Sequence, residues 1–382
     1  MISAKHTPKV IGIIAILGVI VMSIVSTIAH SKIPLDPVLT GKLANSPHYS
    51  DGKFSNWRES WEMSGSNVAS TAWDFFFTRN ARTPDKALPS QQVDLSHFTQ
   101  AGRDQLNVTW LGHSSLLINM DGYKIMTDPV FEKRVSILGP TRFNGEIPVK
   151  LDALPEVDVI VISHDHYDHL NKYSVQQLSA KTAIFIVPLA VGARLIKWGI
   201  PQEKIIELDW WEDYFDNSLL VVATPAQHFS GRGLADRNRT LWASWVIVTP
   251  HHRVFFSGDS GYFDGFKLIG NKYGPFDMTF IECGAYNTAW ADVHMFPEQT
   301  VQAHRDLKGE ILHPIHWGTF NLALHPWYEP MERLITAAAA QGIRTATPMV
   351  GETTQYGKYL PAVPWWQPAR TETKSTDATT IQ

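Results

Sequence analysis

The sequence predicts an α/β fold preceded by a membrane segment, and three features support this prediction. From residue 106 onward, short apolar segments with strand character alternate with segments of helical length. One strongly apolar segment, residues 157–162, is typical of a buried strand and ends in a group of histidines and aspartates at 163–169. Residues 10–29 carry no charge.

The first element is this uncharged segment. As a helix, residues 10–29 would span about 30 Å, the thickness of the hydrocarbon core of a bilayer. Lys5 and Lys9 precede it and no acidic residue does, which places the N-terminus in the cytoplasm and the rest of the chain outside it. A secretory signal cleaved after Ala29 is the alternative, although such signals have apolar regions of roughly 7–15 residues. We therefore expect a transmembrane anchor at 10–30.

Residues 31–104 form an extension rich in aromatic side chains. Trp57 and Trp61 are four positions apart, a spacing that would place both on one face of a helix. The aromatic residues pack against the main domain in one interpretation. In the other, they form a surface that faces the membrane next to the anchor.

The main domain begins with three short strands, of which the last two are joined by a turn at 120–122. Further strands and helices then alternate. Pro297 occupies an early position of one helix, and Gly342 ends the last. The expected strands are 106–110, 115–119, 123–127, 157–162, 182–187, 218–223, 242–248, 253–258 and 277–282; the expected helices are 171–180, 189–198, one opening at 297, and 331–341.

The composition restricts the chemistry of the domain. Among 382 residues the formal net charge is −4, which argues against nucleic acid as a partner because nucleic-acid-binding proteins present a basic surface. The single cysteine, Cys283, excludes an internal disulfide framework and is expected to be a buried packing residue. There are 16 histidines, so any bound metal must be held by imidazoles and carboxylates.

The group that follows the strand at 157–162 has the character of a metal site. His164, His166, Asp168 and His169 fall within six positions at the end of this strand, where α/β proteins place ligand sites. So many charged and polar groups beside a buried strand would be costly without a cation. The arrangement suits two adjacent cations, and the imidazole majority favours zinc.

Further ligands are expected downstream, each at the end of a strand. His228, Asp259 and His316 satisfy this rule, and Asp259 could bridge two metals with its two oxygens. His313 competes with His316 as a candidate. Asp165 and Tyr167 are candidates for orienting the imidazoles. We expect His113, near the start of the domain, to be a buried structural residue.

These residues carry a resemblance to a known family. The cluster H-x-H-x-D-H, with His, Asp and His at later strand ends, resembles the metallo-β-lactamase superfamily. Within it, the chain is similar to the N-acylphosphatidylethanolamine phospholipase D family over about residues 106–345. The segments that match in order are TWLGHSS, TDPVF, ISHDHYDHL, ELDWWE, QHFSGR, LWASW, FSGDSGY, GPFD, GAY and PIHWGTF.

The resemblance implies a four-layer αββα sandwich and a binuclear zinc site. It assigns the ligands as His164, His166 and His228 for one zinc, and Asp168, His169 and His316 for the other, with Asp259 bridging. It also implies that His294 takes part in catalysis and, with Tyr286, contacts the substrate. A zinc pair would lower the pKa of the attacking water, and Asp168 or Asp259 would hold the proton of this water.

The expected function is that of a membrane-anchored zinc phosphodiesterase. It would convert N-acylphosphatidylethanolamine to phosphatidic acid and N-acylethanolamine without a covalent intermediate. The alternatives are a zinc hydrolase of a soluble lactone, β-lactam or cyclic phosphodiester, and a tethered metal-binding protein without catalysis. Phospholipid and membrane are the expected partners, and a homodimer is left open. The expected layout is 1–9 in the cytoplasm, 10–30 in the membrane, 31–104 as the extension, 105–365 as the exported hydrolase domain and 366–382 as a disordered tail.

Overall fold

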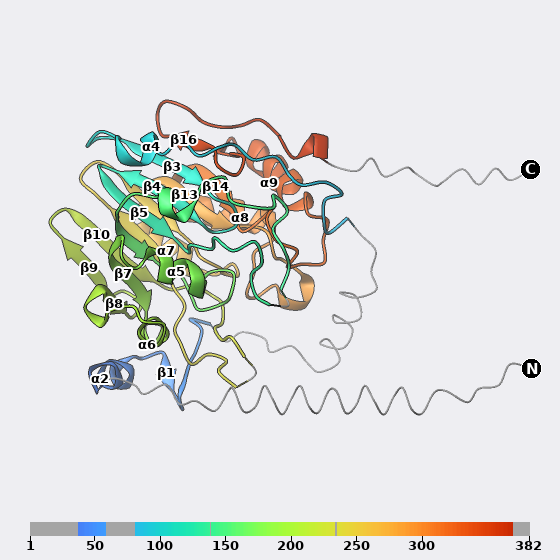
Figure 1. Cartoon of the computed structure of the whole chain (residues 1–382). Coiled ribbons are helices and arrows are strands. Elements are labelled where there is room, and N and C mark those ends of the chain that lie inside the picture. The colour runs from blue at the N-terminus through green and yellow to red at the C-terminus, as the bar shows by residue number, and fades with distance from the viewer. Residues whose placement is uncertain (1–36, 59–80, 138, 234, 370–382) are drawn as a thin grey trace, which may run out of the picture.

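The fold is built on two mixed β-sheets of seven strands each. The computed structural model describes residues 37–58, 81–137, 139–233 and 235–369. Helices lie on the outer faces of the sheets (Figure 1). This arrangement confirms the expected α/β sandwich.

The first sheet has the strand order β16-β3-β4-β5-β6-β7-β8. Its first part is an antiparallel meander, and strands β5 to β8 run parallel. The strands are β3 Leu106–Trp110, β4 Leu116–Met120, β5 Tyr123–Thr127, β6 Val157–Val161, β7 Thr182–Pro188, β8 Ile205–Leu208 and β16 Thr353–Gln355. The expected turn between β4 and β5 is present, and its backbone is left-handed at Asp121 and Gly122.

The second sheet repeats the pattern, with the order β15-β14-β13-β12-β11-β10-β9. Strands β9 to β12 are antiparallel, and β12 to β15 are parallel. The strands are β9 Asp213–Asp216, β10 Leu219–Thr224, β11 Ser244–Val248, β12 Arg253–Phe256, β13 Phe276–Glu282, β14 Gly309–Ile315 and β15 Arg344–Thr345.

Helices pack on the outer face of each sheet. The first sheet carries α4 Ser96–Thr99, α5 Lys172–Leu178 and α6 Gly192–Lys197, and the second carries α7 Gly265–Tyr273, α8 Pro297–Asp306 and α9 Glu329–Ala340. Short 3₁₀ turns lie at Leu151–Ala153, Gln202–Lys204, Thr288–Trp290 and Gln367–Ala369. Asn171 caps α5 by accepting a hydrogen bond from the backbone N–H of Ser174.

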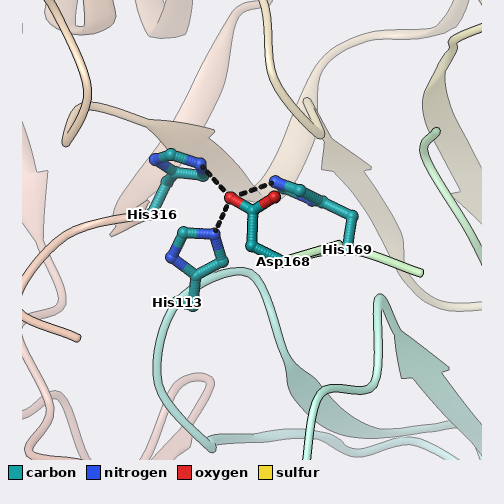
Figure 2. Close-up of side chains that lie close together, drawn as sticks. All are labelled: His113, Asp168, His169 and His316. Atoms are coloured by element: carbon teal, nitrogen blue, oxygen red, sulfur yellow. Dashed lines mark hydrogen bonds and ion pairs between the residues drawn. The ribbon is translucent and has the colours of Figure 1, made fainter. Parts of the chain in front are cut away.

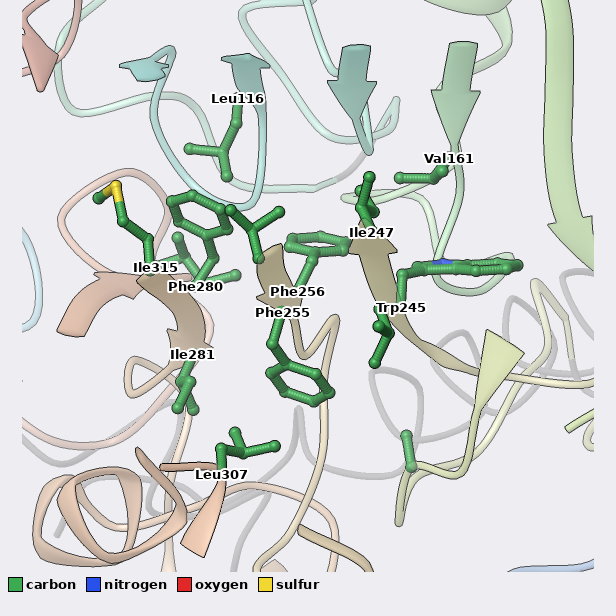
Figure 3. Packing of buried hydrophobic residues seen from close by; sticks show 14 of the residues in the cluster. Leu116, Val161, Trp245, Ile247, Phe255, Phe256, Phe280, Ile281, Leu307 and Ile315 are labelled. Atoms are coloured by element: carbon green, nitrogen blue, oxygen red, sulfur yellow. The ribbon is translucent and has the colours of Figure 1, made fainter. Parts of the chain in front are cut away.

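The central strands of the second sheet, β10 to β14, are largely buried on both faces because one face meets the other sheet and the opposite face meets the helices (Figure 3). Phe256 and Phe280 point toward Leu116 of the first sheet. Phe255 and Ile281 point the other way, toward Leu307 at the end of α8. This two-sided burial explains the nearly continuous apolar sequence of these strands.

The described part of the extension packs against the main domain. It contains α2 Pro37–Asn45 and a small hairpin, β1 Tyr49–Ser50 with β2 Lys53–Phe54. Leu43 and Phe54 are buried in the same hydrophobic cluster as the two sheets. Packing against the domain is therefore confirmed for Phe54, whereas Trp57 is 38% exposed, and Trp61 and the other aromatic residues up to Phe77 lie outside the described residues.

The sequence led to one expectation for each terminus. The expected anchor at 10–30 lies outside the described residues; within the described ranges, no helix has the length and hydropathy needed to cross a bilayer. At the other end, Trp366 was expected to begin a disordered tail. It is instead buried, with its ring 5.6 Å from that of Trp317. Aromatic packing thus extends the fold to Ala369.

Several elements escaped the sequence analysis. Strands β8 and β9 are short and partly exposed, so they have no continuous apolar pattern. Strand β16 is three residues long and pairs with β3, which lies more than 240 positions earlier in the chain. Helix α7 contains two glycines, which weaken its helical character in the sequence.

Candidate metal centre

Loops from both sheets bring the predicted ligands together at one edge of the sandwich. His164, His166, Asp168 and His169 follow β6, and His228 follows β10 by a short loop. Asp259 follows β12 and His316 follows β14 directly. All seven predicted ligands therefore meet, although they span more than 150 positions of the chain.

The first group consists of three imidazoles. One ring nitrogen from each of His164, His166 and His228 lies within 4.8 Å of the others. Nε2 of His164 and Nδ1 of His166 are 2.8 Å apart, and Nε2 of His228 is 3.3 Å from the same Nδ1. Nδ1 of His228 donates to the carbonyl of Val293 at 3.0 Å, which leaves its Nε2 free to act as a ligand.

The second group is centred on Asp168. Figure 2 shows one carboxylate oxygen of Asp168 facing the rings of His113, His169 and His316. The distances from Oδ2 of Asp168 are 3.0 Å to Nε2 of His113, and 3.6 Å to Nε2 of His169 and of His316. His113 is buried and hydrogen-bonded, as the sequence led us to expect, and its partner Asp168 places it beside this site.

Asp259 lies between the two groups. Its Oδ2 is 3.1 Å from Nε2 of both His169 and His316. The same oxygen is 3.7 Å from Nε2 of His228 and 3.9 Å from Nε2 of His164. A carboxylate that faces ligands of both groups has the placement required to bridge two cations.

The residues present fit a metal centre because buried polar atoms converge there without hydrogen bonds. Among the described residues, Nε2 of His169, Nε2 of His316 and Oδ1 of Asp259 are buried and have no hydrogen-bond partner. Leaving such atoms unpaired costs roughly 1–3 kcal/mol each. A cation held by the imidazole and carboxylate donors would satisfy them.

The electrostatics of the site also favour positive charge. Burial by itself lowers the pKa of His316, but Asp259 and Asp168 raise it to about 10. Burial likewise opposes the charge of His169, yet Asp259 and Asp168 raise its pKa well above its ordinary value. Carboxylates that hold protons on two buried imidazoles would attract a cation for the same reason.

Other buried groups orient the ligands. Oδ2 of Asp128 accepts from Nδ1 of His169 at 2.7 Å and from the hydroxyl of Ser163 at 2.6 Å. The backbone N–H of Ser163 donates to Oδ1 of Asp128 at 2.7 Å. Asp128 fixes the imidazole so that Nε2 faces the site. It was missed in the sequence analysis, although it stands in the matching segment TDPVF.

Two candidate orienting residues have another task. Asp165 is fully buried and accepts hydrogen bonds from Arg194 and from the backbone N–H of Gly231. Tyr167 donates to the carbonyl of Arg232 and stacks under its guanidinium at 3.8 Å. Both side chains therefore hydrogen-bond to the loop after His228 and do not orient the imidazoles.

The backbone at the site is strained and closely packed. His113, Asp128 and His316 all have positive φ, at 55°, 35° and 67°, which costs of order 1 kcal/mol each for residues with a side chain. A Cβ on Gly284 would lie 1.8 Å from the carbonyl oxygen of His316. Glycine at 284 therefore permits the close approach that holds His316 in place.

A cavity of about 840 Å³ opens onto the two groups. Its lining includes site residues, the segment 285–294 except Tyr286 and Asn287, and a few residues from elsewhere. Arg237 contributes a guanidinium that lies 4.4 Å above the ring of Phe229. The cavity therefore combines a mostly uncharged wall with a cationic group beside the candidate metal centre.

Of the two residues expected to contact substrate, His294 lines the cavity and Tyr286 does not. His294 lines the cavity and belongs to a third group with His228 and Asp259. Its Nδ1 lies 3.3 Å from Oε1 of Glu282. Tyr286 is buried outside the described cavity lining, and its hydroxyl donates to Glu329 at 2.7 Å. The structure therefore places Tyr286 outside the lining of this cavity, with its ring stacked on His325.

The remaining candidates lie away from the centre. His313 is fully buried on β14, and neither ring nitrogen has a hydrogen-bond partner among the described residues. Since side chains alternate along a strand, His313 points differently from the ligand His316 that follows the strand end. Cys283 is buried as expected, and burial raises the pKa of its thiol well above its ordinary value.

Known proteins share this sequence and fold. Residues 123–317 match the model of the Beta-lactamase superfamily domain. An uncharacterized protein of Mycobacterium tuberculosis is 44% identical over 331 residues, 84% of this chain and 88% of that protein. The N-acyl-phosphatidylethanolamine-hydrolyzing phospholipase D 1 of Caenorhabditis elegans is 35% identical over 267 residues, 65% of this chain and 74% of that protein.

Similarity extends to solved structures. A metallo hydrolase from the archaeon Ignicoccus hospitalis has a TM-score of 0.51 at 21% identity, and the match covers 67% of this chain and 100% of that one. At this identity the likeness shows a shared fold. The comparisons thus confirm the resemblance that the sequence motifs indicated.

Proposed function

Given that this chain belongs to the metallo-β-lactamase superfamily of metal-dependent hydrolases, we propose that it is a membrane-anchored, two-zinc phosphodiesterase. Its substrate is a phospholipid, which it cleaves on the head-group side of the phosphate, as a phospholipase D does. With N-acylphosphatidylethanolamine, the products are phosphatidic acid and N-acylethanolamine. The homologous phospholipase of Caenorhabditis elegans supports this substrate class.

One observation carries the proposal: Oδ2 of Asp259 faces ring nitrogens of both ligand groups, and both groups border the same cavity. His164, His166 and His228 would hold one zinc, and a second would be held by Asp168, His169 and His316. Asp259 would bridge them. Imidazole and carboxylate donors in this proportion suit zinc.

A zinc pair at such a site supplies an activated water and neutralises charge on the phosphate. The chain's own residues then have defined tasks. Asp168 or Asp259 would hold and orient the proton of the attacking water by accepting a hydrogen bond from it. Asp168 stays ionised, because His169 and His113 hold its pKa well below the ordinary value despite burial. The thiol of Cys283 hydrogen-bonds to the carbonyl of Ile315 and is too deeply buried to act as a nucleophile.

The cavity lining supports an amphipathic anion as the substrate. Arg237 provides positive charge near the ligand group of His166, because both residues contact the ring of Phe229. His294 lines the cavity from the segment 285–294 and is placed to contact the head group. Ala289, Trp290 and Val293 in this segment offer apolar surface to the lipid.

The membrane part of the proposal comes from the sequence. The uncharged residues 10–29 anchor the chain, and Lys5 and Lys9 keep the N-terminus in the cytoplasm. The hydrolase domain then acts outside the cytoplasm at the surface of the same membrane. In a bacterial cell this compartment would be the periplasm.

The test is product analysis with the purified full-length chain in detergent. Bound metal is measured first, and N-acylphosphatidylethanolamine in mixed micelles is then supplied as substrate. We expect about two zinc ions per chain and release of N-acylethanolamine. Asp259→Asn should abolish release, whereas the matched control Asp264→Asn, at an exposed surface ion pair with Arg58, should not.

Two results would contradict the proposal. One is a chain that binds two zinc ions, leaves all phospholipids intact and hydrolyses a lactone, β-lactam or cyclic phosphodiester. The other is a chain that binds no metal, or whose Asp259→Asn variant keeps full activity.

A further inference from the structure

A short segment of the N-terminal extension reaches the candidate metal centre. The backbone N–H of Phe54 donates to the carbonyl of Asn238 at 2.7 Å, which ties this segment to the loop after His228. Phe54 itself is buried in the main hydrophobic cluster. The chain then continues to Asn56, which lines the same cavity as the ligands. In Figure 1 this blue segment lies apart from α4 and the strands that begin the main domain.

The side chain of Asn56 pairs with the backbone of His228. Its Oδ1 accepts from the N–H of His228 at 2.9 Å, and its Nδ2 donates to the carbonyl of the same residue at 2.8 Å. Oδ1 also accepts from Nε1 of the buried Trp242 at 3.0 Å. His228 lies outside helices and strands, so Asn56 supplies the pairing that a neighbouring strand would otherwise provide.

A second pair of hydrogen bonds joins the same two segments. Here the side chain comes from Gln227, one position before His228, and the backbone belongs to Arg58 of the extension. Oε1 of Gln227 accepts from the N–H of Arg58 at 3.3 Å, and its Nε2 donates to the carbonyl of Arg58 at 3.0 Å. Segments about 170 positions apart are therefore joined by two reciprocal amide pairs. Each uses both polar groups of a side-chain amide, which only Asn and Gln provide.

The ring of His228 is fixed from the other side. Nδ1 donates to Val293 at 3.0 Å, and this leaves Nε2 facing His166 and Asp259. Asn56 sets where the backbone of His228 lies, and Val293 sets how the ring is turned. Together they determine the position of Nε2.

We infer that Asn56 is a positioning residue for the first cation, acting through His228. Through Asn56, the N-terminal extension then helps to position a ligand of the metal centre. This inference rests on the proposed function only in taking His228 as a ligand. Groups that orient metal ligands contribute about 10- to 100-fold in metal affinity.

The experiment compares full-length wild type with Asn56→Ala and with Ser55→Ala. Ser55 is the matched control because it is adjacent and exposed, and its hydroxyl donates at the surface to the carbonyl of His48. Zinc affinity is measured by chelator competition, and Co²⁺ spectra report the occupancy of each site. Hydrogen exchange at the amide of His228 is followed in the metal-free protein.

We expect Asn56→Ala to lower the affinity for one of the two zinc ions about 10- to 100-fold and to leave the affinity for the other nearly unchanged. The amide of His228 should exchange faster in the metal-free variant, and Ser55→Ala should match the wild type in both measurements. Unchanged affinity for both ions would overturn the inference. An equal loss of affinity for both ions, together with a fall in Tm, would show that Asn56 has a general structural role. This result would also overturn the inference.

The exchange measurement separates this inference from the proposed function. If Asn56→Ala leaves exchange at His228 unchanged, the positioning role is refuted whatever the substrate. If exchange and zinc affinity change as expected but no phospholipid is cleaved, the positioning role holds and the proposed substrate is refuted.

Discussion

Asp128 and His169 form a fully buried pair in which Oδ2 of the carboxylate accepts from Nδ1 of the imidazole at 2.7 Å. The pair turns Nε2 of His169 toward Asp168 and Asp259, with distances of 3.6 and 3.1 Å to their Oδ2 atoms. Asp128 also makes the imidazole more basic, which strengthens it as a ligand.

Asp128→Asn should therefore weaken the binding of the second cation, the one that His169 would hold. The amide oxygen can still accept from Nδ1, but the negative charge behind the ring is lost. We expect zinc affinity at one site to fall about 10- to 100-fold, measured by chelator competition. Asp152→Asn, at an exposed position, is the control, and retention of wild-type affinity for both ions by Asp128→Asn would contradict the prediction.

Arg237→Ala should weaken binding of an anionic substrate. The guanidinium lies over Phe229 at the cavity and is exposed enough to reach a ligand. Loss of one charge-assisted contact made equally in the bound and transition states should raise KM about tenfold and leave kcat nearly unchanged. Steady-state kinetics on mixed micelles provide the measurement. Arg239→Ala, outside the cavity lining, should behave as the wild type, and an equal KM for both variants would contradict the prediction.

His313 should make the fold sensitive to acid. Burial lowers the pKa of its imidazole from 6.5 to about 3, so the unfolded chain binds more protons than the folded chain between these values. The free energy of unfolding therefore decreases as pH falls below 6.5, by at most about 1.4 kcal/mol per pH unit from this group.

His313→Leu should remove this part of the pH dependence. Between pH 7 and pH 5, urea unfolding should show a loss of stability about 2 kcal/mol smaller in the variant than in the wild type. Identical slopes for His313→Leu and the wild type would exclude His313 as the source.

Trp366→Ala should destabilise the fold. The ring is 2% exposed and packs against Trp317, and its Nε1 donates to Glu332 at 3.0 Å. Truncation of a buried tryptophan costs about 3–5 kcal/mol, which should lower Tm markedly. Val363→Ala, at a position that is 71% exposed, should leave Tm within about 1 °C, whereas an unchanged Tm for Trp366→Ala would place residue 366 outside the cooperative fold.

The sequence revealed the ligands because their signal is local or follows a simple rule. His164, His166, Asp168 and His169 stand together after an apolar strand, and the carboxyl ends of strands are where sites form. His113 and Asp128 also follow expected strands, 106–110 and 123–127, but this rule alone did not reveal which ligand each would contact. Their part in the site depends on the antiparallel β3–β4–β5 meander, which brings both loops beside β6.

The sequence by itself determined the chemistry of the centre: imidazoles and carboxylates, a single cysteine, and an α/β framework read from strand periodicity. Only the tertiary structure decided which isolated polar residues serve that centre. It brought Asn56 to the backbone of His228, Asp128 to the ring of His169 and His113 to Asp168, and it placed Tyr286 against His325 and Glu329. The physical reason is that a hydrogen bond depends on distance and direction in space, and for residues tens to hundreds of positions apart these are set by how the two sheets pack.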